Sequence, residues 1–411
     1  MAGFRRIVTF ADQGVSSISN FIAVAVAANV ATAHEFGQFS LAYAGLLLFL
    51  GGQRALVGET LLVRYYRTGQ LTPSTASASL GATALVAVPA TVLLLPGALI
   101  AGPGDAYLWL MMALVSPFVL LQDSVRYLFI CQGRPARALF IDSVWALGSI
   151  TAMLLAARSG SGLETVVMWW GLGSAVALVL GLVLARSGPR PVAGGRWLWE
   201  NRDFAFRYLA EFATLNASSF AVLYILVFPL GAVGVGALRA AQLLFSPLNT
   251  VFGAIKTAVI PELVRTRGTP VFRRTLMETL LVVSVLSVGW GTAVLLLPAT
   301  AGELVLGETW NNAAELRWPY AIQYLAMVPY TVLLAYFRAT ESNRLSTQMR
   351  GALAALTLVL PLGLSLTTST AVTAWGFAAA AAAAGACGVL AARRSRVRIS
   401  RTAAAALQPS D

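Results

Sequence analysis

Residues 36–64 read FGQFSLAYAGLLLFLGGQRALVGETLLVR, and this stretch decides the fold. Its apolar run, 36–58, is long enough to cross a bilayer as a helix, which needs roughly 20 residues. The run ends at a gap that holds Arg64 and Arg67. Apolar blocks alternate with gaps along the whole chain, and the arginines fall almost entirely in every second gap. Loops rich in Lys and Arg stay on the cytoplasmic side of a bilayer. If every second gap is cytoplasmic, each apolar block between two gaps crosses the membrane, so this pattern predicts repeated membrane spans.

The amino-acid composition also indicates a membrane protein. Of the 411 residues, 58% are apolar and 11% are charged, against roughly 45–50% and about 25% in soluble domains. A soluble protein of this kind would expose large apolar patches. The net charge of +12 is spread over short gaps, so we interpret it as a topology signal and as contact with membrane lipids, and we expect no nucleic acid partner.

We expect an all-α polytopic membrane protein with about twelve spans. They lie near residues 11–31, 36–58, 79–101, 107–130, 139–157, 164–185, 209–229, 236–258, 276–300, 318–338, 351–369 and 371–392. The predicted outer gaps are short and hold only Arg158 and Arg317 among the arginines. An even number of spans with arginine-rich ends places both termini in the cytoplasm.

The longest inner gap divides the chain into two lobes of six spans each. We predict an N-terminal lobe at 1–190, a linker at 191–208 and a C-terminal lobe at 209–392, followed by a basic cytoplasmic tail at 393–411. The linker mixes aromatic and charged residues around Trp197 and Trp199, a composition typical of a helix that lies in the membrane interface.

The two halves of the sequence carry similar residues at corresponding positions. Asp12 and Glu211 each open a half, and Gly37 follows Asp12 by the interval at which Gly236 follows Glu211. The second span of each half closes on a glutamate and an arginine, Glu59 with Arg64 and Glu262 with Arg265. With six spans in each half, the repeats run parallel, which is one architecture of two-lobed transporters.

Ionisable residues inside spans cost at least about 2.5–3.5 kcal/mol at the bilayer centre, so they face a cavity or a partner. The candidates are Asp12, Arg54, Glu59, Asp123, Arg126, Asp142, Glu211 and Arg239. Most of them fall in the inner half of their spans, which favours a polar cavity open to the cytoplasm. Arginine in such a cavity matches phosphate oxygens bidentately.

Structural roles are the alternative for several of these residues. Asp123 and Arg126 are three residues apart and can pair on one helix face. Asp12 and Glu211 can each cap a helix N-terminus. Arg126, Glu59 and Asp142 lie near enough to the inner interface to extend into it or to cap loops.

Three features that the sequence lacks exclude several classes of protein. No GxxxxGK[ST] motif is present, so a P-loop ATPase is excluded. Two cysteines without CxxC spacing indicate neither a disulfide framework nor a metal site. The short outer gaps leave no room for an external catalytic domain, so we expect a transporter and not an enzyme.

Four segments resemble a known family. They are ADQGVSS at 11–17, EFGQF at 35–39, QRALVGE at 53–59 and QGRP at 132–135. Together they resemble polysaccharide flippases of the Wzx type, which belong to the MOP superfamily with the MATE multidrug exporters and the lipid II flippases. The resemblance is specific over roughly the first 145 residues and rests on topology beyond them.

The resemblance implies a MATE-like pair of six-helix lobes in a bacterial cell membrane. It implies that an undecaprenyl-pyrophosphate-linked oligosaccharide moves from the inner to the outer leaflet by alternating access, for cell-surface polysaccharide biosynthesis, with a polysaccharide polymerase as a further partner. The headgroup would fall on Arg54, Arg126 and Arg239. Ion coupling or cavity polarity, with H⁺ or Na⁺ and no other cofactor, would fall on the acidic residues Asp12, Glu59, Asp123, Asp142 and Glu211.

Three other functions remain open. One is a scaffold or permease partner of an ATPase, which needs a coupling helix in an inner loop, and the segment around Trp197 and Trp199 is the only candidate for that helix. A MATE-like cation-coupled exporter of small molecules needs an inward-facing acid that no arginine matches. A membrane polysaccharide polymerase or ligase needs a sizeable outer loop with Arg or His, and the sequence shows none.

Overall fold

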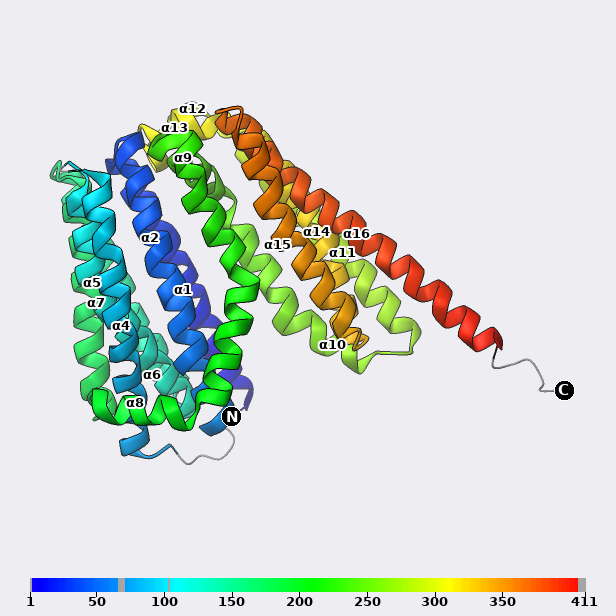
Figure 1. Ribbon diagram of the computed structural model, residues 1–411, viewed down its shortest axis with the longest axis horizontal. Coiled ribbons are helices and arrows are strands. Elements are labelled where there is room, and N and C mark those ends of the chain that lie inside the picture. Colours follow the sequence, from blue (N-terminus) through cyan, green and yellow to red (C-terminus); the bar gives the residue numbers. More distant parts are fainter. Residues whose placement is uncertain (1, 66–70, 103, 406–411) are drawn as a thin grey trace. The chain divides into compact units, whose positions relative to one another are not determined.

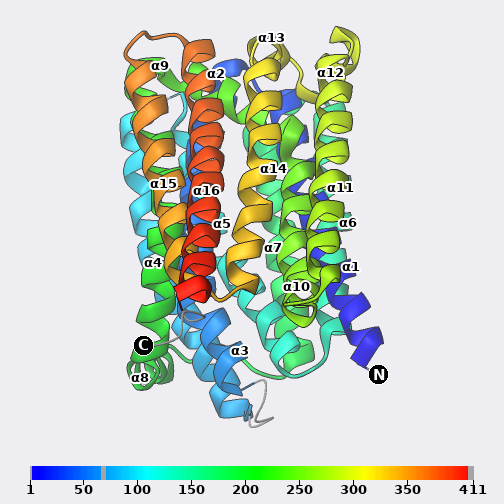
Figure 2. The same ribbon diagram turned by 90° about the vertical axis from the view of Figure 1, so that its right-hand side faces the viewer.

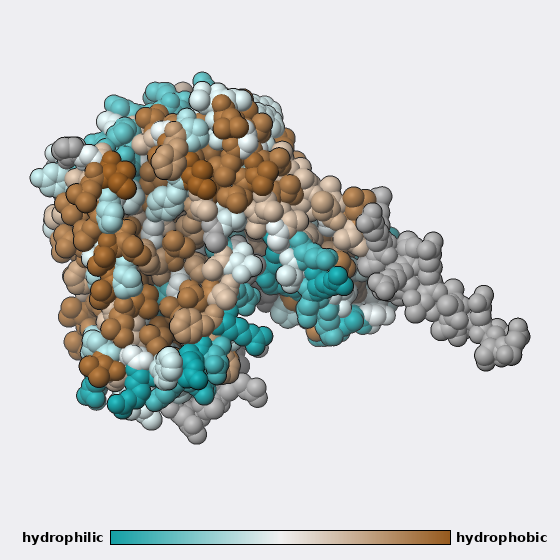
Figure 3. Space-filling view, in the orientation of Figure 1, coloured by the Kyte–Doolittle hydropathy of each residue, from teal (hydrophilic) through white to brown (hydrophobic). Residues whose placement is uncertain are grey.

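A computed structural model describes residues 2–65, 71–102 and 104–405 of the chain, and every regular element in those ranges is a helix. Figures 1 and 2 show long helices that run side by side. In the view of Figure 3, hydrophobic side chains cover the middle of the first half of the chain and hydrophilic ones gather at its lower edge. This is the surface expected of helices that cross a bilayer.

The first half of the chain contains six long helices. They are α1 (Ala2–Val30), α2 (Ala33–Gln53), α4 (Pro73–Ala101), α5 (Ala106–Cys131), α6 (Pro135–Arg158) and α7 (Leu163–Ala185). A π-helix, η1 (Arg54–Glu59), and the short α3 (Thr60–Tyr65) continue α2 without a break. The predicted linker contains α8 (Pro191–Glu200), which is a separate short helix.

The second half repeats this order. It contains α9 (Arg202–Ala254), η2 (Ile255–Val259), α10 (Ile260–Arg265), α11 (Pro270–Leu295), α12 (Ala299–Leu306), α13 (Thr309–Ala314), α14 (Arg317–Ala339), α15 (Asn343–Ser365) and α16 (Thr370–Ala405). The helix α16 extends into the predicted basic tail, whereas 406–411 and Arg67 lie outside the described residues.

The twelve predicted spans are all present as helices. Among the described residues, ten helices are long and apolar enough to cross a membrane. The helix α1 adds a shorter apolar stretch, Gly14–Val30. The helix α9 consists of two helices that meet at Gly231, where φ is +66°. That left-handed conformation is readily adopted by glycine alone, so Gly231 allows the chain to turn between the seventh and eighth spans.

Several helix ends differ from the predicted span limits, and two of the differences have a clear physical reason. The span predicted at 276–300 ends at Leu295, and the gap after it holds two short helices, α12 and α13, in place of a plain loop. Pro298 ends the run because proline cannot donate the backbone hydrogen bond that a continuing helix needs. The span predicted at 351–369 begins earlier, at Asn343, because its first turns are polar and carry Arg344.

The two halves correspond more closely in structure than in sequence. Each has a π-helix at the end of its second span, η1 and η2, and each π-helix is followed by one short α-helix. A π-helix is rare, so its presence at matching places supports an internal duplication. The equivalent glycines also meet, because a Cβ atom on Gly236 would lie 2.9 Å from the backbone nitrogen of Gly37.

The chain forms two compact units. The first unit contains Met1–Tyr224, Gly231–Ala240 and Ala299–Asn311, and the second contains Ile225–Leu230, Ala241–Pro298 and Asn312–Asp411. In the first unit, α5 packs against α2, α4, α6 and α7 and is its most buried span. In the second unit, α16 packs against both α14 and α15 (Figure 2). The lobe boundaries predicted from the sequence stay a prediction.

Candidate functional site in the first unit

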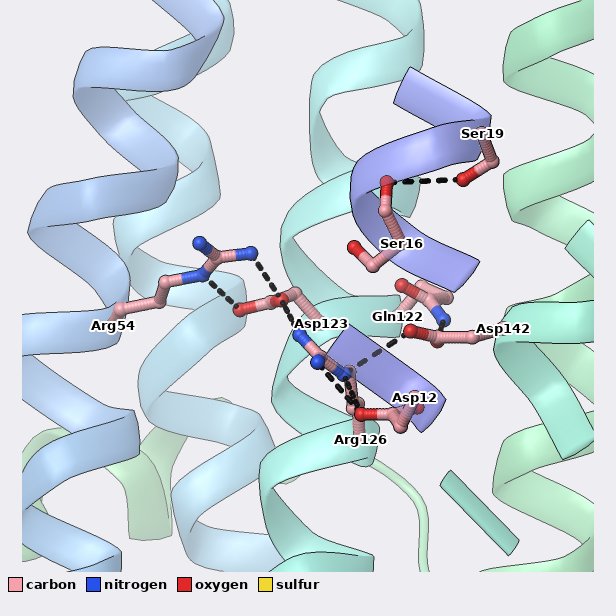
Figure 4. A network of polar contacts seen from close by, with 8 residues as sticks. All are labelled: Asp12, Ser16, Ser19, Arg54, Gln122, Asp123, Arg126 and Asp142. Atoms are coloured by element: carbon pink, nitrogen blue, oxygen red, sulfur yellow. Dashed lines mark hydrogen bonds and ion pairs between the residues drawn. The ribbon is translucent and has the colours of Figure 1, made fainter. Parts of the chain in front are cut away.

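Five of the predicted ionisable residues form one network in the first unit. Helix α5 supplies Asp123 and Arg126, α1 supplies Asp12, η1 supplies Arg54 and α6 supplies Asp142 (Figure 4). Because α5 lies at the centre of the unit, its polar face reaches three neighbouring elements. Asp12, Asp123, Arg126 and Asp142 are the only charged residues that are buried in the described part of the chain.

Arg54 is held by Asp123 through two parallel hydrogen bonds. Its Nε donates to Oδ2 over 2.9 Å and its Nη2 donates to Oδ1 over 2.7 Å. The arginine is the first residue of η1, and π-helical turns are frequent at functional sites. A guanidinium has five N–H groups, so three remain available. The Arg54 side chain is 37% exposed and that of Asp123 is 6% exposed.

Arg126 is the central counter-ion of the network. Its Nε and Nη2 both donate to Oδ2 of Asp12, over 2.9 and 2.6 Å. Its Nε also lies 3.1 Å from Oδ2 of Asp142, and its Nη1 lies 3.7 Å from Oδ1 of Asp123. Gln122 fixes Asp142 from the other side, since its Nε2 donates to Oδ1 over 2.7 Å.

The network has more acidic than basic groups. Three aspartates surround two arginines, which gives a net charge of −1 when all five are ionised. Asp12 and Asp142 share Arg126 as their common counter-ion. The Oδ1 atom of Asp12 is buried and has no hydrogen-bond partner in the described part of the chain. Only the other oxygen of this carboxylate, Oδ2, is bonded to Arg126, and a buried polar atom without a hydrogen bond is costly.

A cavity adjoins the network. Its volume is about 400 Å³, counting the part that is open to solvent, and its lining includes Arg54, Asp123, Arg126 and Asp142. The rest of the lining mixes polar and aromatic residues with aliphatic ones. The polar and aromatic residues are Ser16, Asn20, Tyr43, Gln122, Trp145 and Trp170, and the aliphatic ones are Leu46, Leu47, Leu50 and Val119. A second cavity of about 290 Å³ shares Ser16, Asn20, Asp142 and the two tryptophans. The two cavities therefore adjoin each other beside Asp142, and Ser16 and Asn20 of α1 line both of them.

The other three predicted residues lie outside the network. Glu59 and Glu211 are exposed. Arg239 is half-buried on α9 and acts electrostatically on Tyr43, as Arg54 does. The roles predicted for all eight residues, headgroup binding and ion coupling, stay predictions.

The structure corrects two of the alternative roles. Asp12 and Glu211 do not cap helices, because α1 begins at Ala2 and α9 begins at Arg202, well before either acid. Arg126 does not extend to the membrane interface, because it is only 6% exposed and is enclosed by carboxylates.

Several residues of the cavity were not predicted from the sequence. Ser16 and Asn20 follow Asp12 at intervals of four, so helical spacing could have placed them on the face of Asp12. Trp145 follows Asp142 by three residues and could have been found in the same way. Nothing in the sequence indicated that Tyr43 and Trp170 line a cavity, since an aromatic residue in an apolar span usually packs in the core or faces lipid.

Comparison with known proteins shows similarity of fold but no close similarity of sequence. No family model matches this chain, and no curated protein matches it at a significant level. An inward-facing multidrug resistance transporter of the MATE family matches with a TM-score of 0.73 and 12% identity, over 96% of this chain and 99% of that one. The lipid II flippase MurJ, in an inward closed conformation, matches with a TM-score of 0.68 and 10% identity, over 95% and 87%.

A third solved structure is a MOP superfamily transporter from Pyrococcus furiosus, described as having a binding pocket of reverse polarity. It matches with a TM-score of 0.60 and 12% identity, over 96% of this chain and 94% of that one. Each similarity extends over nearly the whole chain. The protein is therefore a multi-pass membrane protein with the fold of the MOP superfamily transporters.

Proposed function

We propose that the protein is a flippase that moves a lipid-linked oligosaccharide, joined to undecaprenyl through pyrophosphate, between the leaflets of a bacterial cell membrane. The observation that carries the proposal is the Arg54 guanidinium at the cavity, on a side chain that is 37% exposed. It keeps three N–H donors beyond the two that Asp123 occupies. Planar arginine donors suit phosphate oxygens. The match to a lipid II flippase supports a substrate of this class.

Asp123 has a defined part in this proposal. Two parallel bonds fix the plane of the Arg54 guanidinium, so its free donors point in one direction without a further entropic cost. A pyrophosphate that reaches the cavity meets donors that are already oriented. The arginine distribution favours a cytoplasmic position for both termini, so we expect the substrate to enter from the inner leaflet.

The excess carboxylate provides a route by which an ion can control binding of the substrate. When Asp12 or Asp142 takes up H⁺ or Na⁺, the net charge of the network changes from −1 to zero, which favours an anion on Arg54. Release of the ion restores the negative charge and weakens anion binding. The ion and the anionic substrate therefore bind with positive cooperativity, and by linkage each raises the affinity for the other. Because the ion and the anion bind together by this route, an inward H⁺ or Na⁺ gradient does not drive the substrate outward through it.

The test is export in a deletion strain that carries variants of Arg54. We expect Arg54→Ala to accumulate lipid-linked oligosaccharide in the inner leaflet, measured with a leaflet-resolved label. Arg274→Ala is the matched control, because it removes one arginine that is exposed and bonded to Glu278. Normal export by an Arg54→Ala protein that is inserted at wild-type levels would refute the headgroup assignment.

The net charge of −1 favours a second candidate, a cation-coupled exporter of small molecules. In that case the substrate is cationic and Arg54 opposes it. Arg54→Ala should then maintain or increase efflux of a cationic dye such as ethidium, while oligosaccharide export does not depend on the protein. The two functions thus predict opposite effects of one substitution.

A further inference from the structure

The short helix α8 lies beside a membrane span and not beyond its end. The backbone N–H of Arg190 donates to the carbonyl oxygen of Ser77 over 3.1 Å. Further along, Gly195 faces the side chain of Leu85. These contact points on α4 are about 6 and about 18 Å from its first residue, at 1.5 Å per residue. The helix therefore packs against the flank of α4, within the first turns of a span (Figure 1).

One face of α8 is fixed to the protein. Trp197 is 4% exposed and belongs to a buried cluster with Val57, Leu61, Ala78 and Ala82. Gly194 lies so close to Gly81 that a side chain at either position would overlap backbone atoms. Because α8 is packed in this way, its opposite face keeps a fixed direction.

The opposite face is apolar and basic. Val192, Arg196 and Trp199 are spaced at four and three residues, so they share one side of the helix. Val192 is 89% exposed and Trp199 is 68% exposed. The Arg202 guanidinium stacks on the Trp199 ring, 4.7 Å from its centroid, and its Nη1 donates to the carbonyl oxygen of Trp199 over 3.2 Å. Arg196 and Arg202 thus lie on either side of Trp199.

The basic groups of this region greatly exceed the carboxylates that they contact. Within the described residues, the side chains of Arg186, Arg190 and Arg196 form no ion pair or hydrogen bond. Two acids are near, Glu200 and Asp203, and both are exposed. The contact between Arg202 and Asp203 is 4.0 Å, with Asp203 90% exposed, and such a pair contributes little in water.

We propose that the outward face of α8 binds an anionic phospholipid. Arg196 and Arg202 take the phosphate, while Val192 and Trp199 lie at the boundary between headgroups and acyl chains, where tryptophan is favoured. Exposed arginines without carboxylate partners complement the negative charge of such a lipid. The position beside α4 places these groups at the depth of the headgroups on the side of the membrane where α4 begins.

The experiment is native mass spectrometry of the full-length protein in detergent, titrated with dioleoyl-phosphatidylglycerol. Each arginine near a membrane surface contributes about a fivefold increase in affinity for anionic lipid, so we expect R196Q/R202Q to lower the affinity of one bound lipid about 25-fold. The pair R265Q/R274Q is the matched control. It removes the same charge, but both arginines are already bonded to glutamates, Glu262 and Glu278.

Two results would overturn the proposal. One is equal retention of phosphatidylglycerol by R196Q/R202Q and by R265Q/R274Q, because binding would then follow only total charge. The other is retention of zwitterionic dioleoyl-phosphatidylcholine with the same affinity, because the face would then not select an anion. The conservative pair R196K/R202K keeps both positive charges and should therefore keep most of the binding.

Discussion

Replacement of Arg126 by glutamine tests whether the buried network is one electrostatic unit. The substitution removes the donors that contact Asp12 at 2.6 and 2.9 Å and Asp142 at 3.1 Å. It changes the net charge of the network from −1 to −2, while the carboxylates stay buried. Removing one partner of a buried ion pair costs about 3–5 kcal/mol, so we expect a loss of this size in the free energy of unfolding.

Asp142→Asn is the contrasting substitution. It preserves the shape of the side chain and changes the net charge from −1 to zero. It weakens one contact at 3.1 Å, and an amide oxygen can still accept the hydrogen bond from Gln122. We therefore expect a free energy of unfolding within about 1 kcal/mol of the wild-type value. In R126Q/D142N the net charge is again −1, so this double variant should be more stable than the sum of the single effects predicts by at least about 1 kcal/mol.

The assay is reversible unfolding of the purified protein in mixed micelles, followed by circular dichroism as the fraction of denaturing detergent increases. Size-exclusion chromatography before each titration confirms that the variants begin from the same monodisperse state. The reasoning is refuted if Arg126→Gln unfolds within about 1 kcal/mol of wild type, or if Asp142→Asn costs as much as Arg126→Gln.

Five further substitutions test packing and hydrogen bonding. Trp197→Ala should cost about 3–5 kcal/mol, because a buried ring leaves a cavity, whereas Trp199→Ala should stay within about 0.5 kcal/mol, because it is exposed; thermal unfolding of both variants compares them. Gly37→Ala should lower the yield of folded protein by chromatography, since its methyl group would overlap the backbone of Ala232, while Gly148→Ala, with open space around it, should not. Asn29→Ala removes two hydrogen bonds, to the carbonyl oxygens of Glu303 and Leu304; we expect faster hydrogen exchange in α12, and unchanged exchange there would contradict that role of Asn29.

The spans could be predicted because a helix in a bilayer must satisfy its own backbone and expose apolar side chains. Both constraints produce long runs of apolar residues, which the hydropathy of the sequence shows. The π-helices could not be predicted in this way, because a single wider turn requires no particular residue type. The short helices α12 and α13 were missed because Pro298 and the polar residues after it also suit a loop.

The network was predicted as a set of residues and not as a set of bonds. The sequence indicated Asp123 with Arg126, a pair on one helix, yet their contact of 3.7 Å is the longest in the network. Asp123 instead holds Arg54, which is 69 residues away in the sequence. Arg126 holds Asp12, which is 114 residues away. Such partners depend on how helices pack around α5, and spacing within one helix carries no information about that.

The contact between Gly37 and Gly236 has a consequence for the origin of the chain. A position that touches its own repeat-equivalent behaves as a residue on a twofold axis does in a symmetric dimer. An ancestor of six spans could therefore have paired with a second copy of itself through this glycine. Such a dimer would have carried two copies of any charged network and borne the cost of burying both. Among the described residues, buried charges now occur only in the first unit. Fusion of the two copies into one chain would have allowed one half to lose its buried charges while the other kept them.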